Sequence, residues 1–233
     1  MSLEYTGDAM RLACPQVVGR EAEHTMRRRE ADLRWQPASP KRREERSMLI
    51  TNERQRLIEC VHYFASRMDG MDTAKLFRLL YLLDFIHCRE TGRSVTELEY
   101  FAEATGPKPR VLAVEIVEPS LDWAGSVRFE HSSDQQDGLS IVVSSVRPFK
   151  PWNTSRRQRE LMKRLCQDYH DKRADQISED VEFENPPWER VFHRESGCGA
   201  SIPYEYAFRS EEFDLMSELR KEHLETVRVL RGW

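Results

Sequence analysis

The residues best suited to chemistry in this chain are an acid and an imidazole, Asp84 and His87, three positions apart near the end of the apolar stretch KLFRLLYLLDFIHCRE. Side chains three apart share one face of a helix, so the carboxylate can orient the imidazole as a general base. The nearest nucleophile, Cys88, follows His87 directly, and these two side chains diverge by about 100° on a helix. In the structural alternative, Asp84 binds backbone groups of a neighbouring loop and His87 forms hydrogen bonds near the helix C-terminus. We favour the structural interpretation.

The other histidines and cysteines do not have the spacing of a metal centre. The seven histidines show no HExxH or HxxxH pattern, and the five cysteines include no CxxC pair. We therefore expect no metal, no cofactor and no disulfide framework, and reduced thiols indicate a cytoplasmic protein. Cys198 lies in the glycine-rich sequence GCGAS, which lacks the lysine of a phosphate-binding loop. A reactive thiol and a structural turn both remain open at this position, and we favour the turn.

The composition is typical of a folded protein. Of the 233 residues, 39% are hydrophobic and 33% are charged, and the formal net charge is -4, so a general attraction to nucleic acid is not expected. No apolar run approaches the roughly 20 residues that span a bilayer, which argues against a membrane partner. A basic segment follows Ser155, and it is either a solvated helix face or a docking patch for an acidic partner or nucleic acid. Its cations are Arg156, Arg157, Arg159, Lys163 and Arg164.

Hydrophobic periodicity predicts a mainly α protein of the α+β class, a single compact helical domain with a small antiparallel β-hairpin. Apolar residues at spacings of three and four predict a helix from Thr51 to Met68. The next helix begins after Asp72 and is stopped by Gly92; it is apolar around most of its circumference and therefore belongs inside a bundle. β-Branched residues at 126–130 and 138–146 predict the two strands of the hairpin.

Further helices are predicted at 111–117 and 155–172, and from about Ser210 to the end of the chain. The last of these is expected to direct its apolar side chains inward. They are Met216, Leu219, Val227 and Leu230. Residues 178–180 are expected to lie in a short helical piece.

The segments between these elements are predicted from their glycines and prolines. Residues 96–102 are expected to be extended. The sequence GPKP at 106–109 predicts a turn, because prolines fix φ and remove backbone donors. The segments 184–193 and 194–208 are predicted to be mostly loop and turn.

Residues 1–47 differ from the rest of the chain. They are dense in alternating charge and have almost no periodic apolar face, which predicts a poorly ordered charged extension before a domain at 48–233. An arm that binds nucleic acid is the alternative, although the interleaved acids weaken it. The abrupt change in composition also raises a third interpretation, in which Met48 is the natural start.

Motifs along the chain resemble one known family. In order, they are Lys75-Leu76, Leu79-Leu80-Tyr81, Asp84, His87, Thr91-Gly92-Arg93, Tyr100, Gly106-Pro107-Lys108-Pro109 and the segment SIPYEYAF at 201–208. The order, the spacing and the residue types of these motifs are similar to those of the Panacea domain family. This family is also called SocA-like antitoxins and was earlier grouped with phage-associated proteins. The resemblance covers roughly residues 51–208, so the predicted domain at 48–233 is a Panacea domain followed by a C-terminal helix. Glu97 and Lys108 depart from the family pattern, and both alter the loop surface more than the core.

The resemblance implies a small, largely helical cytoplasmic protein of a prokaryote, encoded beside a toxin that it neutralises by direct protein–protein binding. It implies no enzymatic activity. One branch of the family instead hands its toxin to a protease, so a proteolytic adaptor or regulator is the second hypothesis. A hydrolase that uses His87 or Cys198 is the third.

On this interpretation most motif residues stabilise the fold rather than react. They are Lys75, Asp84, His87, Thr91, Gly92, Arg93, Tyr100, Gly106, Pro107 and Pro109. A second group is expected to contact the partner. It comprises Glu97, Lys108, Tyr204 and Glu205. Three tryptophans, Trp123, Trp152 and Trp188, would suit the centre of an interface, but each could equally be buried.

Overall fold

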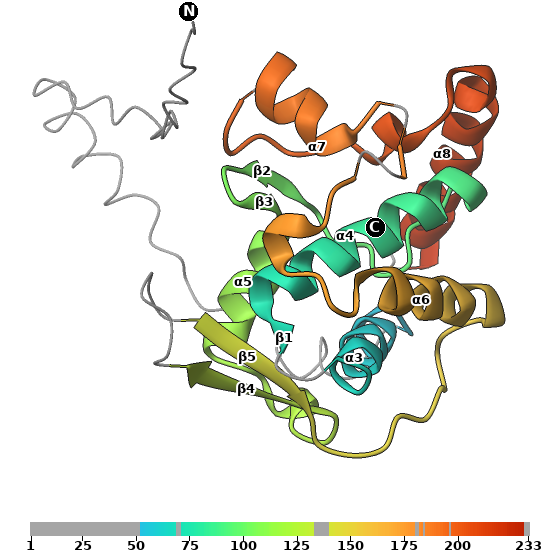
Figure 1. Ribbon diagram of the computed structural model, residues 1–233. Helices are drawn as coiled ribbons and strands as arrows, with labels where there is room; N and C mark the ends of the chain where they lie inside the picture. Colours follow the sequence, from blue (N-terminus) through green and yellow to red (C-terminus); the bar gives the residue numbers. More distant parts are fainter. Residues whose placement is uncertain are drawn as a thin grey trace, which may run out of the picture. The chain divides into compact units, whose positions relative to one another are not determined.

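The computed structural model describes most of the chain after residue 51, and these residues belong to one compact unit, Ile50–Trp233 (Figure 1). The described ranges are 52–68, 71–132, 140–179, 182–183, 185–195 and 197–230. The predicted charged extension, 1–47, lies outside them.

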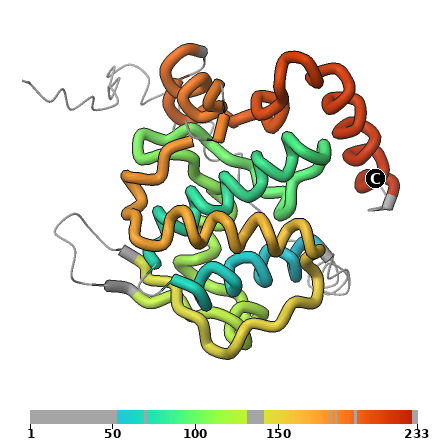
Figure 2. Tube along the Cα trace, turned by 45° about the vertical axis from the view of Figure 1, so that its right-hand side comes forward, coloured from blue at the N-terminus to red at the C-terminus, as the bar shows by residue number. Residues whose placement is uncertain are grey.

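Helix α4, Thr73–Thr91, is the central element of the described fold. Every residue from Leu79 to Cys88 is buried, as expected for a helix that is apolar on nearly all sides. Helices α3, Asn52–Ala65, and α6, Arg156–Tyr169, pack against α4 and against each other, and the three run close together in both ribbon and tube views (Figures 1 and 2). The predicted buried helix is therefore confirmed.

The predicted hairpin is present and belongs to a three-stranded antiparallel sheet. Its strands are β4, Val127–Ser132, and β5, Ser140–Ser145. The two-residue strand β1, Met71–Asp72, pairs with the other edge of β5, so the order is β1-β5-β4. Because β1 leads directly into α4, this sheet is connected to the start of the central helix.

A second hairpin corrects the prediction for GPKP. Strand β2, Phe101–Glu103, pairs antiparallel with β3, Gly106–Lys108, and the turn between them falls at residues 104–105 rather than at the prolines. The predicted extended segment 96–102 enters regular strand structure only at Phe101. Pro107 is compatible with β3 because this is an edge strand of a two-stranded ribbon.

The remaining elements are helical. They are α5 Arg110–Val117, η1 Leu121–Trp123, η2 Ala174–Gln176, α7 Pro187–Glu189, the π-helical turn η3 Arg190–Glu195, η4 Tyr204–Ala207, η5 Ser210–Glu212 and α8 Phe213–Leu230. The protein is thus mainly α with small antiparallel sheets, as predicted.

Three local predictions were wrong. The segment 184–193, predicted to be mostly loop and turn, contains α7 and most of η3, whereas 194–208 is mostly loop and turn as predicted, with η4 near its end. The short helical piece expected at 178–180 lies slightly earlier, at Ala174–Gln176, and Ser178 and Glu179 are not helical. In α8, Leu219 is 40% exposed although it was expected to face inward.

Candidate functional site

Asp84 joins the central helix to the loop that follows it. Its side chain is fully buried, and Oδ1 accepts hydrogen bonds from the backbone N–H groups of Val95 and Thr96, each at 2.7 Å. Oδ2 accepts from the Tyr100 hydroxyl at 2.8 Å and from the Thr96 hydroxyl. Burial raises the pKa of Asp84 to about 6, while these hydrogen bonds act in the opposite direction by favouring the carboxylate. The Asp84 carboxylate therefore holds the loop that follows α4 against this helix.

His87 fixes the last turn of α4 in a similar way. Its Nδ1 lies 2.6 Å from the carbonyl oxygen of Arg93. Because a carbonyl oxygen only accepts, Nδ1 carries the proton and the neutral ring has its lone pair on Nε2. The Thr91 hydroxyl also donates to the carbonyl oxygen of His87 at 2.7 Å. Burial lowers the pKa of His87, so the neutral ring is favoured.

Gly92 ends α4 and makes room for α8. Its φ of 70° is left-handed, and its N–H donates to the carbonyl oxygen of Cys88 at 2.8 Å. A Cβ at this position would lie 3.0 Å from Cβ of Leu219 and 3.3 Å from the backbone nitrogen of Arg220. Helix α8 therefore packs directly on the turn, where only a glycine fits without adjustment.

The acid–imidazole pair considered from the sequence does not form. Among the described residues, no hydrogen bond joins Asp84 to His87, since each side chain contacts a different part of the following loop. Burial raises the pKa of the Cys88 thiol to about 12, which keeps it protonated and a poor nucleophile. Cys198 is exposed and is not among the residues lining the cavity beside His87.

Two motif cations lie at opposite ends of α4. The Lys75 ammonium donates to the carbonyl oxygen of His170 at 2.7 Å, and so ties α4 to the end of α6. Arg93 follows the helix; its carbonyl oxygen receives the His87 bond, whereas its guanidinium is exposed. Lys75 is thus placed as a structural residue, and the Arg93 side chain stays available at the surface.

The glycine and prolines of GPKP shape the β3 hairpin. Gly106, at φ 120°, lies against the guanidinium of Arg78: a Cβ there would be 2.8 Å from Nη2. Pro107 is buried within β3. Pro109 precedes α5, and its carbonyl oxygen accepts from the N–H of Ala113 at 2.9 Å.

Two of the four candidate partner-binding residues contact α8 instead. Glu97, at φ 56°, has Oε1 3.1 Å from Nε2 of His223. Glu205 Oε1 accepts from Nε of Arg220 at 3.1 Å. Both carboxylates therefore help to hold α8 on the rest of the fold.

The other two candidates differ from each other. Tyr204 is buried, its ring stacks on Phe85 with centroids 4.6 Å apart, and its hydroxyl donates to the carbonyl oxygen of Leu98 at 2.6 Å. This places Tyr204 in the core rather than on a surface that a partner could reach. Lys108 is exposed at the end of β3 and remains available to a partner.

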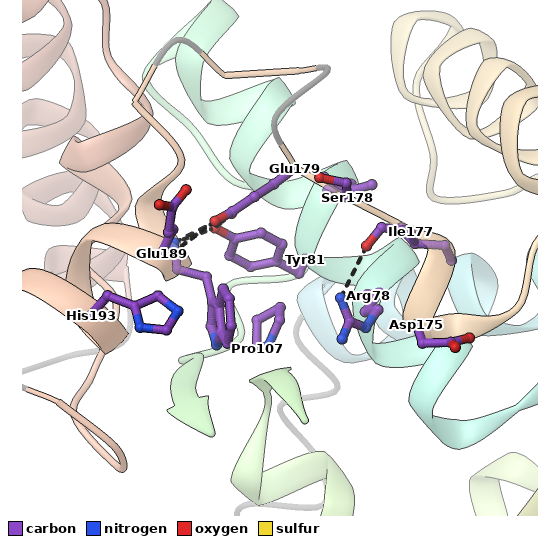
Figure 3. Close-up of a pocket in the computed structure, with 11 residues that line it drawn as sticks. Arg78, Tyr81, Pro107, Asp175, Ile177, Ser178, Glu179, Glu189 and His193 are labelled. Atoms are coloured by element: carbon purple, nitrogen blue, oxygen red, sulfur yellow. Dashed lines mark hydrogen bonds between the residues drawn. The ribbon is translucent and has the colours of Figure 1, made fainter. Parts of the chain in front are cut away.

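Sequence reasoning missed a cavity of about 440 Å³ beside α4 (Figure 3). There the Tyr81 hydroxyl donates to Glu179 at 2.5 Å, and the same carboxylate accepts from the N–H of Glu189 at 2.9 Å. Figure 3 shows these two side chains pointing toward each other, with Arg78 at the other end of the cavity donating to the carbonyl oxygen of Ile177 at 3.0 Å. The only sequence signal was the spacing of Arg78 and Tyr81, which places them on one face of α4.

The three tryptophans that could be either at an interface or buried lie in three different settings. Trp123 is buried, Trp188 is partly buried with its indole N–H donating to the carbonyl oxygen of Glu103 at 3.1 Å, and Trp152 is 82% exposed. Only Trp152 is placed to meet a partner.

A row of valines on α5 forms an exposed apolar face that sequence reasoning also missed. Val111, Val114 and Val117 are 72%, 73% and 56% exposed, whereas Leu112 and Ile116 on the opposite side of the helix are buried. We call these three valines the valine face. Three β-branched side chains directed to solvent from one helix are a candidate contact surface.

The fold and the contacts of the motif residues define a helical module. Its polar motif residues mainly hold a loop and α8 against a buried helix. Residues 76–189 match the model of the family described as antitoxin SocA-like, Panacea domain. The resemblance inferred from the motifs is therefore confirmed, although Lys75 and the SIPYEYAF segment lie outside the matched residues. No curated protein and no solved structure matches the chain. No helix in the described part of the chain is long and apolar enough to cross a membrane.

Proposed function

We propose that this protein is an antitoxin that acts in the cytoplasm and neutralises a co-encoded toxin by binding it directly, without catalysis. The match of residues 76–189 to the SocA-like antitoxin family carries the proposal. The site chemistry supports it, because Asp84 and His87 each bind loop backbone groups rather than one another.

The valine face is the surface best suited to this binding. Helix α5 is held to α3 by Arg54, whose guanidinium donates to Glu115 at 2.8 Å and to Asp122 at 2.8 Å. The valines are therefore presented by a fixed helix, which reduces the entropy lost when a partner orders the interface. Apolar side chains at the centre with charged groups at the edge are the usual anatomy of a protein–protein interface.

The test is co-expression of this chain with the adjacent gene, scoring growth and co-purification together. Rescue of growth with a stable complex is the expected result. Rescue without a complex, accompanied by falling partner levels, would replace direct neutralisation by delivery to a protease. A neighbouring gene with no toxicity of its own would remove the antitoxin proposal.

A further inference from the structure

A second cavity, of about 390 Å³, lies beside the end of α4 and is independent of the valine face. Four helices contribute to its wall, with Arg56 from α3, His87 from α4, Gln158 from α6 and Glu222 from α8. Its volume is within the range of small-molecule sites. The polar groups in this wall decide which ligand it suits.

Gln158 presents an uncommitted donor in this cavity. The residue is only 8% exposed, and its Oε1 accepts from the N–H of Ser155 at 2.8 Å in the capping box of α6. That bond fixes the orientation of the amide, because the Ser155 N–H needs an acceptor. Among the described residues the amide nitrogen of Gln158 has no partner, so its two hydrogens are left for a ligand.

His87 presents a second uncommitted group. It is 7% exposed, and Nδ1 is already bound to the carbonyl oxygen of Arg93. Its Nε2 has no partner within the described ranges. In the neutral ring this nitrogen accepts, and on protonation it donates. A ligand with ionised oxygens would therefore favour the protonated ring.

Positive charge exceeds negative charge around these two groups. Arg56 donates from Nε to the carbonyl oxygen of Val95 at 2.6 Å, which fixes its guanidinium at the wall. Neither Arg56 nor Arg93 forms an ion pair with another described residue. Glu222, which is exposed, also lines the cavity and supplies one negative charge against these two guanidinium groups.

We propose that this cavity binds a phosphate group, either free phosphate or the monoester of a small molecule. Donors from three elements line the cavity: Arg56 on α3, Gln158 on α6 and Arg93 in the loop after α4. A phosphate has several terminal oxygens that can accept charge-assisted hydrogen bonds from such a set of donors. The N-terminal end of α6, a helix of 14 residues, adds its positive dipole end near Ser155 and Gln158. The remaining volume accommodates a small organic body.

The charges that face His87 make its ring a reporter of binding. Arg56 and Arg157 disfavour the imidazolium and Glu90 favours it, in addition to burial, which lowers the pKa of His87 most. Arg93, Glu222 and His223 also line the cavity, and His223 is 3.1 Å from Glu97. A bound phosphate adds negative charge beside the ring, so the pKa of His87 should rise on binding.

The experiment follows the His87 ring signals of the full chain by NMR in phosphate-free buffer, during titration with inorganic phosphate, with glycerol 3-phosphate, and with chloride at equal ionic strength. Saturable shifts with a phosphate probe but not with chloride are expected. Tighter binding of the monoester would identify an esterified ligand, and equal or weaker binding would identify free phosphate. No shift with either phosphate probe, or the same shift with chloride, would overturn the proposal.

Two variants and one matched control test the assignment. Gln158→Glu keeps the oxygen that accepts from Ser155 and replaces the free donor by an anionic oxygen, and Arg93→Glu reverses an exposed cation. Each should weaken phosphate binding by about tenfold or more. Lys163→Glu changes net charge as much as Arg93→Glu but lies outside the cavity wall, and it should bind normally. Equal weakening in Lys163→Glu would mean that only the overall charge matters and would also refute the site.

Discussion

At the scale of single residues, the buried Asp84 carboxylate accepts four hydrogen bonds that a substitution would remove. Replacing it by alanine leaves the Val95 N–H, the Thr96 N–H and the Tyr100 hydroxyl buried without an acceptor. A buried donor without a partner costs about 1–3 kcal/mol, so Asp84→Ala should lower the free energy of unfolding by about 3 kcal/mol or more. Asp84→Asn retains one acceptor oxygen and should lose less. Urea denaturation of both variants measures the difference, and an unchanged midpoint in Asp84→Ala would refute the role given to this carboxylate.

His87 predicts a pH dependence. Its pKa is lowered in the folded state, so below its ordinary value of 6.5 the unfolded chain binds more protons than the folded one. The free energy of unfolding should therefore fall as the pH drops below 6.5. The raised pKa of Asp84 acts oppositely: its contribution is present at low pH and is lost as the pH rises through about 6.

The comparison that separates the two groups is wild type against His87→Asn, in phosphate-free buffer. The asparagine amide can donate to the Arg93 carbonyl oxygen but does not titrate in this range. Between pH 7.5 and 5, wild type should lose stability relative to His87→Asn. Parallel curves for the two proteins would contradict the assignment.

Which residues could be predicted from sequence depends on how local their partners are. The structural interpretation of Asp84 and His87 needed only the loop that directly follows α4, and the observed partners lie there. The Tyr81–Glu179 contact joins residues far apart in the sequence, and periodicity contains no information on such pairs. Tyr204 was wrongly predicted to contact a partner for the same reason. The sequence does not distinguish a motif tyrosine whose ring is stacked in the core from one that is exposed.

At the scale of elements, periodicity was sufficient for α4 and for the β4–β5 hairpin because burial decides both patterns. It failed for α7, where Pro186 and Pro187 indicated a loop. In the structure, the carboxylate of Glu179 caps the start of α7 by accepting hydrogen bonds from the N–H groups of Trp188 and Glu189. An N-terminal acceptor supplied from outside the local sequence cannot be found by a search for a capping residue next to the helix.

The junction of α4 and α8 gives a prediction with an internal control. Gly92 and Gly197 both have left-handed φ values, 70° and 77°, but a Cβ at Gly92 meets α8 while a Cβ at Gly197 meets nothing within 4 Å. Each alanine variant should lose about 1 kcal/mol from the backbone conformation alone. Gly92→Ala should lose more, because Leu219 and the backbone of α8 must move. Thermal unfolding of both variants tests this, and equal losses would show that α8 does not press on the turn.

At the scale of the whole molecule, the residues that stabilise the described fold are largely different from the exposed residues that could contact a partner. The polar motif residues hold the loop and α8 on α4, whereas the valine face lies on α5 and takes no part in those contacts. The phosphate cavity shares His87, Thr91 and Arg93 with the motif, but Arg56 and Gln158 in its wall lie outside the motif. Loss of partner binding, loss of phosphate binding and loss of stability should therefore be separable by substitution.

The valine face provides the sharpest test of that separation. Val114 on α5 and Val229 on α8 are 73% and 74% exposed, so Val114→Asp and Val229→Asp make the same chemical change at equal exposure on different surfaces. If the valine face contacts the toxin, Val114→Asp should weaken the complex by about tenfold or more, because the new carboxylate would be buried at the centre of the interface. The unfolding temperature of this variant should stay near that of wild type. Val229→Asp should bind normally. The measurement is the affinity of each purified variant for the product of the adjacent gene, with growth rescue scored in parallel. Full affinity in Val114→Asp would exclude the valine face as the contact surface and leave the antitoxin proposal to be tested on the exposed residues Trp152 and Lys108.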